Sequence, residues 1–232
     1  MGVCRMFSAV SAIIWFMFSS VIIMAAAKVS NRRAEKMQKE GMELPEYYCP
    51  YGKSKKNLAM LAVGMVISAA CGYVTAEMTD SGAANAALCI SYLGALGAAV
   101  VDWKIQIIPN FIPLVLLCAR IVILLYEWMS GSFLFENLIS SLLGSVLCLG
   151  GLTIADKLSS GGIGKGDVKL LAAIGFTSGA YTVFSILLFA LVFCSIAAVV
   201  LVFGKKATWK SQLPFGPFVY TGFLCMLLLS YI

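Results

Sequence analysis

The chain of 232 residues is 61% hydrophobic, and only 12% of its residues are charged. Because a soluble domain of this size needs more charged surface, the composition excludes an ordinary soluble protein and predicts one polytopic membrane domain over residues 1–232. Histidine is absent, which excludes Ser-His-Asp and Cys-His catalytic sites and any metal site built on imidazole. The formal net charge of +6 is too small to indicate a nucleic-acid partner, and membrane topology explains it better.

The eight cysteines form no Cys-x-x-Cys pair, and most of them lie inside apolar runs. Thiols in such places pack like small hydrophobic side chains. We therefore expect them to pack between helices rather than to hold a metal ion or a set of disulfides. They are Cys4, Cys49, Cys71, Cys89, Cys118, Cys148, Cys194 and Cys225.

Apolar runs that could span a bilayer as helices recur along the chain, and they predict an all-α bundle of about eight transmembrane helices. The sixth run is short, so we expect it either not to cross fully or to be tilted and completed by its flanks. Small residues are expected to hold the helices together, as at Gly94, Gly97, Gly144, Gly150 and Gly151. The runs are residues 6–27, 58–76, 86–101, 108–128, 134–155, 168–177, 181–203 and 213–232.

Residues 28–57 form the one long polar segment. We interpret it as a cytoplasmic loop that sets the orientation, or alternatively as a surface for a substrate or for anionic lipid head groups; residues 30–40 are also compatible with an extension of the first helix. All Lys and Arg residues except Arg5 and Arg120 then lie in loops on the same side. This positive-inside pattern predicts an N-terminus outside. Arg120, in the middle of the fourth run, is expected to face the bundle interior or to snorkel.

Two aspartates stand at the ends of apolar runs, and this topology places both at the cytoplasmic face. Asp102 ends the third run, and Asp167 begins the sixth. Two carboxyl groups that meet at the membrane edge cannot both ionise cheaply, so one stays charged while the other keeps a proton. Such a pair activates water, because the charged partner takes a proton and the protonated partner donates to a peptide carbonyl. The alternative is structural, with Asp167 capping a helix and Asp102 anchoring a span.

Three irregular segments are expected on the same side of the membrane. Glycines before Asp167 let the backbone approach an extended substrate, and prolines follow Asp102 and precede the last run. Irregular backbone at membrane depth is tolerated where it is buried or lines a cavity, so we expect these segments to meet around the acids. A third acid, Asp156, is expected to pair with Lys157, and Lys169 either tunes Asp167 or only satisfies the positive-inside pattern. The residues expected to bind substrate or shape the site are Gly162, Gly164, Gly166, Lys169, Pro109, Asn110, Pro214, Gly216 and Pro217.

The motifs are similar to those of the prepilin peptidases, the aspartic leader peptidases of type IV pilus, competence and type II secretion systems. That family has an aspartate shortly before Ile-Pro-Asn/Asp, matched by Asp102 and residues 108–110. It has Gly-x-Gly-x-Gly-Asp-x-Lys-Leu, matched by residues 162–170, and Pro-Phe-Gly-Pro-Phe, matched by residues 214–218. The motifs occur in family order, so residues 94–232 are expected to form the motif-bearing catalytic core.

The resemblance implies that Asp102 and Asp167 are the catalytic pair of a GxGD-type aspartic endopeptidase. The implied substrates are type IV prepilin-like precursors of pilus, competence or secretion systems, whose short basic leader is cut at the cytoplasmic face of the bacterial plasma membrane. Many bacterial members carry two Cys-x-x-Cys pairs in the first cytoplasmic loop and also methylate the new N-terminus. Residues 28–57 contain only Cys49, so we expect neither zinc nor S-adenosylmethionine as a cofactor and no methyl transfer.

Two other functions stay open from the sequence. One is a broader GxGD intramembrane protease that cuts inside transmembrane helices. The other is a transporter or assembly factor that uses the two acids to carry protons.

Overall fold

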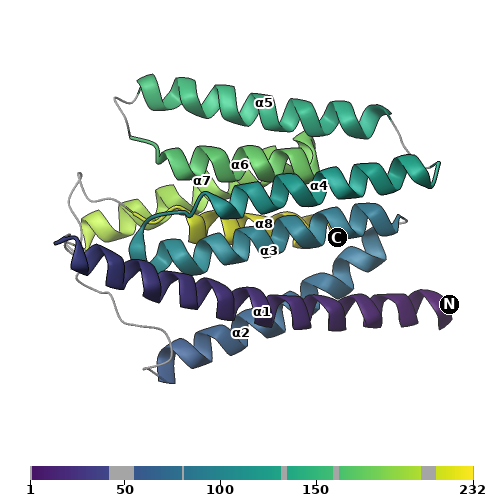
Figure 1. The fold of residues 1–232 in the computed structure, drawn as a ribbon, viewed down its shortest axis with the longest axis horizontal. Helices are drawn as coiled ribbons and strands as arrows, with labels where there is room; N and C mark the ends of the chain where they lie inside the picture. The colour runs from purple at the N-terminus through teal and green to yellow at the C-terminus, as the bar shows by residue number, and fades with distance from the viewer. Residues whose placement is uncertain are drawn as a thin grey trace.

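The computed structural model describes residues 2–41, 55–79, 81–131, 135–158, 162–204 and 213–231. Within these ranges the chain forms eight α-helices and no β-strand (Figure 1), which confirms the predicted all-α bundle. Each predicted apolar run coincides with one helix. The helices are α1 Gly2–Lys39, α2 Lys55–Met78, α3 Gly82–Ile105, α4 Phe111–Met129, α5 Phe135–Leu158, α6 Lys165–Ser178, α7 Ala180–Phe203 and α8 Gly216–Tyr231.

Five helices in the described part of the chain are long and apolar enough to cross a membrane, namely α1 from Val10 onward, α3, α4, α5 and α7. Two shorter apolar stretches are Ala62–Glu77 within α2 and the whole of α8. With 14 residues, α6 is about 21 Å long, which is less than the roughly 30 Å of a bilayer's hydrocarbon core. The sixth helix is therefore short, as its apolar run predicted.

The polar segment 28–57 begins as helix, because α1 continues without interruption to Lys39. No Pro or Gly occurs in residues 28–40, and an exposed ion pair joins Lys36 Nζ to Glu40 Oε1 one turn later at 3.5 Å. The interpretation of the whole segment as a loop is therefore wrong for its first part, and the alternative extension of the first helix is confirmed. The remainder of the segment falls outside the described residues.

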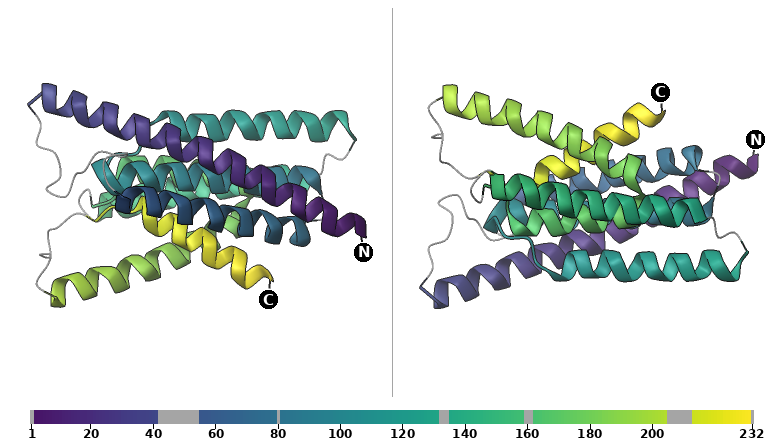
Figure 2. Two further views of the ribbon diagram at one scale, coloured as in Figure 1. Left: turned by 90° about the horizontal axis from the view of Figure 1, so that it is seen from below. Right: turned by 90° about the horizontal axis from the view of Figure 1, so that it is seen from above.

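The short helix α6 lies at the centre of the bundle, where it contacts α3, α4, α5 and α7. In Figure 1 it lies between α5 and α4. The first two helices pack on each other and reach the rest of the molecule through α3 and α8, and Figure 2 shows α1 running obliquely across the bundle. Because α3 contacts both α1 and α6, it connects the pair α1 and α2 to the centre of the bundle.

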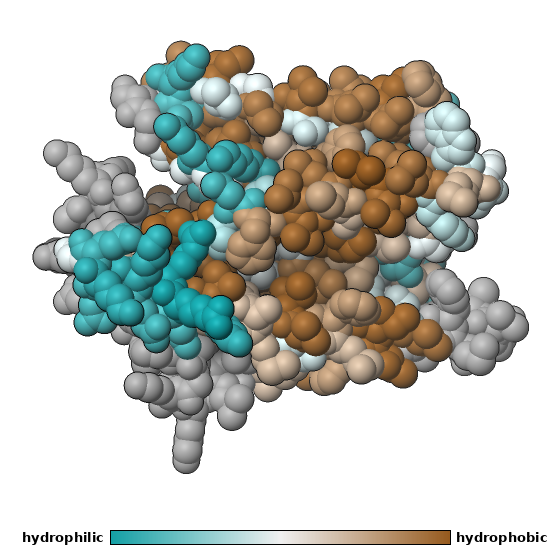
Figure 3. Space-filling model, viewed as in Figure 1, coloured by the Kyte–Doolittle hydropathy of each residue, from teal (hydrophilic) through white to brown (hydrophobic). Residues whose placement is uncertain are grey.

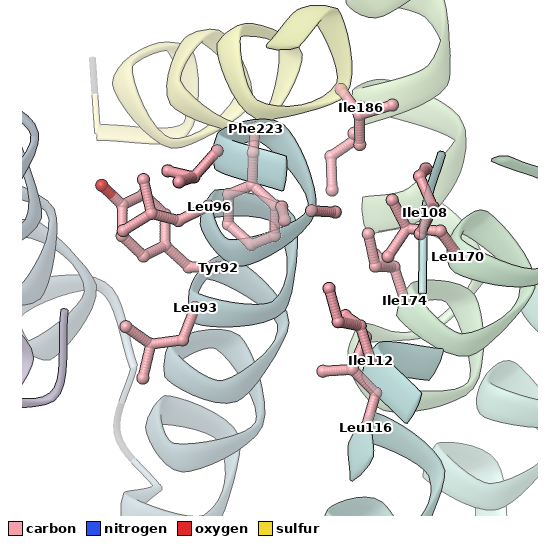
Figure 4. Close-up of a cluster of buried hydrophobic side chains, with 14 of the residues drawn as sticks. Tyr92, Leu93, Leu96, Ile108, Ile112, Leu116, Leu170, Ile174, Ile186 and Phe223 are labelled. Atoms are coloured by element: carbon pink, nitrogen blue, oxygen red, sulfur yellow. The ribbon is translucent and has the colours of Figure 1, made fainter. Parts of the chain in front are cut away.

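Buried apolar side chains join the helices around α6 (Figure 4). Leu96 of α3 and Phe223 of α8 lie on one side of this cluster, and Leu170 and Ile174 of α6 lie on the other. Ile108, from the segment after α3, lies beside Leu170. All five side chains are buried. Close packing of this kind resists displacement, so the core fixes where the first turn of α6 stands.

Small residues allow close helix contacts at some predicted positions but not at others. A Cβ on Gly94 would lie 2.7 Å from a side chain of α4, and one on Gly144 would lie 2.8 Å from the carbonyl oxygen of Gly175 on α6. Gly150 and Gly151 have nothing within 4 Å of such a Cβ. Their predicted packing role is wrong, because they lie on an open face of α5. The positions with close contacts are Gly94, Gly97 and Gly144.

Candidate active site

Three irregular segments meet at one end of the bundle. They are residues 106–110 between α3 and α4, residues 162–164 before α6, and residues 213–215 before α8. All three lie at the end where α1 finishes, on the left in Figure 1. Hydrophilic residues gather at this end in Figure 3, whereas much of the remaining visible surface is apolar. The structure thus places the three motif segments together, as we expected from the sequence.

Asp102 lies in the last turn of α3, and only 4% of it is exposed. Its Oδ2 accepts a hydrogen bond of 2.8 Å from the backbone N–H of Gly216, 114 positions later in the chain. The backbone of Phe215 contacts the same carboxylate. A Cβ on Gly216 would lie 2.9 Å from the Cβ of Asp102, so this contact needs a glycine. The start of α8 therefore presents N–H donors to the Asp102 carboxylate, an arrangement that favours negative charge.

The helix that carries Asp102 ends one turn after it. Gln106 takes a left-handed φ of 51°, and its N–H bonds to the carbonyl oxygen of Asp102 at 2.9 Å. Such a backbone conformation is uncommon for a residue other than glycine, and it ends a helix by turning the chain away. The turn directs residues 107–110 towards α6.

Asp167 is the third residue of α6, and Gly164 caps that helix in an extended conformation. The carbonyl oxygen of Gly164 accepts the N–H of Asp167 at 3.0 Å. Oδ2 of Asp167 folds back so closely that a Cβ on Gly164 would lie 2.6 Å from it. The other oxygen, Oδ1, is buried and has no hydrogen-bond partner among the described residues. Asp102 lies within electrostatic range of Asp167, so the fold brings the two predicted acids near each other.

The segment after Asp102 also contacts the first turns of α6 directly. A Cβ on Gly166 would lie 3.1 Å from the Cβ of Ile108, which explains the need for a small residue there. Lys169 Nζ donates a hydrogen bond of 3.3 Å to Asn110 Oδ1. This bond gives Lys169 a role that the sequence did not suggest, because it links the two aspartate-bearing motifs.

The remaining predicted residues shape the backbone around the acids. Pro109 is buried, and its carbonyl oxygen accepts the N–H of Ile112 at 3.1 Å as α4 begins. Pro217 lies in the first turn of α8, where the N–H that proline lacks is not needed. Pro214 precedes that turn and is partly buried, and Gly162 is exposed at the edge of the site.

Asp156 makes a contact at this end that the sequence did not predict. It lies in the last turn of α5, and its Oδ1 accepts a hydrogen bond of 3.0 Å from the N–H of Ile163. The expected pairing of Asp156 with Lys157 stays a prediction. Ile163 belongs to the glycine-rich loop before Asp167. No sequence signal indicates this bond, because the local sequence does not fix the direction of a donor seven residues away.

Arg120 faces the bundle interior, as predicted. Its guanidinium Nη1 lies 3.7 Å from Glu127 Oε1, and Nη2 donates to Ser141 Oγ at 3.2 Å. A cavity of about 190 Å³ lies beside this pair and is also lined by Thr177 near the end of α6. Ten residues of helix separate Asp167 from Thr177, so the cavity lies roughly 15 Å from the aspartates along α6. The buried arginine is therefore remote from them.

The free thiols in the described part of the chain include those of Cys71, Cys89, Cys118, Cys148, Cys194 and Cys225. In the ranges that the structure covers, no group of three or more Cys, Asp or Glu side chains could hold a metal ion. Cys49 lies outside those ranges, so the expectation that the first loop binds no zinc stays a prediction.

Comparison with known proteins agrees with the motifs. Residues 87–201 match the type IV leader peptidase family, a range that includes both aspartates and ends before Pro214. The chain is also similar to the prepilin leader peptidase/N-methyltransferase of Bacillus subtilis (strain 168), with 29% identity over 129 residues. The aligned part is 53% of this chain and 48% of that protein, so the chain spans about half the length of that relative. No solved structure matches the chain significantly. Residues 87–201, which contain both aspartates, are thus similar to the type IV leader peptidase family.

Proposed function

We propose that this protein is a membrane aspartic endopeptidase that removes the short basic leader from type IV prepilin-like precursors. The observation that supports this most is the meeting of Asp102 and Asp167 at one end of the bundle, within electrostatic range of each other. The match of residues 87–201 to the type IV leader peptidase family and the similarity to a protein named prepilin leader peptidase also support the proposal. The aspartic chemistry, the substrate and the membrane face are parts of the proposal.

The surroundings of the two acids support different roles for them. Asp102 receives an N–H donor at the start of α8, and donors of this kind stabilise a carboxylate in its charged form. No described residue donates to Oδ1 of Asp167, and a second charge beside Asp102 would be repelled. We assign Asp102 as the base that takes a proton from water and Asp167 as the acid that protonates the peptide carbonyl. The water oxygen bonds to the carbonyl carbon as the carbonyl π bond opens, which gives the tetrahedral intermediate. The C–N bond of this intermediate then breaks, the leaving amine takes the proton that Asp102 received from water, and Asp167 regains its proton as the carboxyl product forms.

The glycine-rich loop supports binding of an extended substrate. A helical segment hides its peptide bonds, so the residues around the cleavage site must be extended when they reach the acids. Gly162 and Gly164 are exposed beside Asp167, and backbone without side chains allows a peptide to come close. We place this event at the cytoplasmic face of the bacterial plasma membrane, with the N-terminus outside, because Lys and Arg residues concentrate in the loops on that side.

We further propose that cleavage uses neither zinc nor S-adenosylmethionine and that the product keeps a free N-terminal amine. Residues 28–57 contain one cysteine, and a structural zinc site needs about four Cys or His ligands. The printed name of the Bacillus relative includes an N-methyltransferase, so methyl transfer is the activity to examine beside cleavage.

The proposed function is tested by co-expression with candidate prepilins, with leader removal followed on a gel and the cut site identified by mass spectrometry. The unaltered chain should cleave at the leader boundary. Asp102→Asn and Asp167→Asn should each abolish cleavage although the protein still inserts, because each amide keeps the size of the side chain and cannot transfer the proton. Substantial cleavage by either variant would contradict the assigned pair. Cuts inside a transmembrane helix would favour a broader intramembrane protease, and no cleavage at all would favour the proton-carrying alternative.

A further inference from the structure

We infer that Asp156 is a positioning residue, which holds the glycine-rich loop and thereby keeps the Asp167 carboxylate in place for the cleavage proposed above. This inference rests on the proposed function and adds to it a residue outside the three motifs. It starts from the hydrogen bond of 3.0 Å between the Ile163 N–H and Asp156 Oδ1.

Asp156 stands where an acidic residue does not stabilise its own helix. It lies in the last turn of α5, and the carbonyl groups at a helix C-terminus repel a carboxylate. A bond from a backbone N–H outside the helix offsets this repulsion, because hydrogen bonds to an ionised acceptor are stronger than neutral ones. The side chain is therefore directed to the loop.

The bond acts close to Asp167 along the chain. Ile163 directly precedes Gly164, the N-cap of α6, and a Cβ on Gly164 would lie 2.6 Å from Asp167 Oδ2. Movement of the loop towards α6 would push this oxygen, and movement away would open space behind it. By fixing Ile163, Asp156 thus fixes the position of Gly164, which bounds one side of the space that the Asp167 carboxylate occupies.

The opposite wall is already rigid. Gly166 packs against Ile108, and Leu170 and Ile174 of α6 are fully buried in the core. The helix body therefore cannot follow a displaced loop, so any shift concentrates at residues 163–167. A misplacement of about 1 Å in a catalytic group can slow a reaction by ~100-fold, which makes this contact relevant to rate.

The test compares Asp156→Ala and Asp156→Asn with the unaltered chain, using a purified prepilin substrate. Asparagine keeps an oxygen that accepts the Ile163 N–H, whereas alanine does not. We expect Asp156→Ala to lower kcat by about 10–100-fold with KM changed less than about two-fold, and Asp156→Asn to stay within about three-fold in both. Lys157→Ala, an exposed neighbour in the same turn, should leave both constants unchanged.

A purely structural role for Asp156 would lower the thermal unfolding temperature or the amount of inserted protein rather than kcat. Hydrogen exchange of the peptide covering residues 162–168, read by mass spectrometry, supplies a measurement that needs no activity. We expect faster exchange in Asp156→Ala and unchanged exchange in Asp156→Asn.

Full activity of Asp156→Ala would overturn the inference while leaving the proposed function intact. Equal losses in Asp156→Ala and Asp156→Asn would also overturn it, because the charge rather than the acceptor would then matter. If the unaltered chain cleaves no prepilin, the proposed function fails instead. Hydrogen exchange then tests the contact between Asp156 and Ile163 by itself. Unchanged exchange of residues 162–168 in Asp156→Ala would show that Asp156 does not hold the glycine-rich loop.

Discussion

At the scale of single residues, the position of the Asp167 carboxylate depends on the absence of a side chain at Gly164. A Cβ on Gly164 would lie 2.6 Å from Asp167 Oδ2, although the backbone of Gly164 is extended and open to any residue. We therefore expect Gly164→Ala to lower cleavage by at least about ten-fold, because the added methyl group displaces the carboxylate. The flexible end of the aspartate can move aside, so thermal unfolding should change little.

The matched control is Gly150→Ala in α5, where an added Cβ meets nothing within 4 Å. This change should leave cleavage unaltered and stabilise the helix slightly, since alanine favours helix over glycine. Comparable activity of the Gly164 and Gly150 variants would argue against a tight fit between residue 164 and the aspartate.

At the scale of helices, Tyr92 of α3 links α1 and α2 to α3 and α8. Its hydroxyl group hydrogen-bonds with Ser68 of α2 at 3.0 Å and with Tyr220 of α8 at 2.8 Å. Its ring lies 4.9 Å from the ring of Trp15 in α1. One fully buried side chain of α3 therefore contacts three other helices, and its polar group is satisfied inside the bundle.

A buried ion pair lies within α4, between Arg120 and Glu127, and Arg120 also donates a hydrogen bond to Ser141 of α5. Replacing Arg120 with Met leaves Glu127 as a buried charge without that partner, so we expect a loss of about 3–5 kcal/mol in the free energy of unfolding. Replacing both Arg120 and Glu127 with Met should destabilise less than the single change, because the remaining side chains are uncharged. Unfolding in detergent would measure all three forms. A double variant less stable than Arg120→Met would contradict this expectation, because Glu127 would then stabilise the protein through contacts other than Arg120.

At the scale of the whole molecule, the two aspartates can cooperate only if the loops alternate across the membrane as proposed. Cysteine labelling in a cysteine-free background should find residues 28–57, 156–166 and 204–210 inside, and residues 77–85 and 129–133 outside. The physical basis is the retention of Lys and Arg on the cytoplasmic side. A loop found on the other side would refute the assignment of the active site to the cytoplasmic face.

Cleavage by the intact protein tests the proposal that neither zinc nor S-adenosylmethionine is used. Purified protein should cut a prepilin peptide at the same rate with and without a chelator, because one cysteine in the first loop cannot hold structural zinc. The new N-terminus should stay unmodified when S-adenosylmethionine is present. Mass spectrometry would detect a methylated product by the added mass of one methyl group, and that result would reverse the proposal.

The sequence by itself determined the helical membrane bundle and the order of its helices. The length and composition of an apolar run decide whether it can form a membrane helix, and both are local properties. The same holds for the short α6. The sequence only left the extension of α1 to Lys39 open, although no Pro or Gly interrupts residues 28–40. Motif spacing also singled out Asp102 and Asp167 as candidates, since glycines and prolines mark irregular backbone wherever they occur.

Only the tertiary structure decided which of these residues touch. The bond from Gly216 to Asp102 joins positions 114 residues apart, and it depends on how α3 and α8 are rotated about their axes. In the same way, the rotation of α5 about its axis leaves Gly150 open, whereas Gly144 of α5 meets Gly175 of α6. Such contacts depend on helix register and crossing geometry, which arise from the packing of all the helices together. A run of apolar residues with little amphipathic pattern does not reveal which face turns inward.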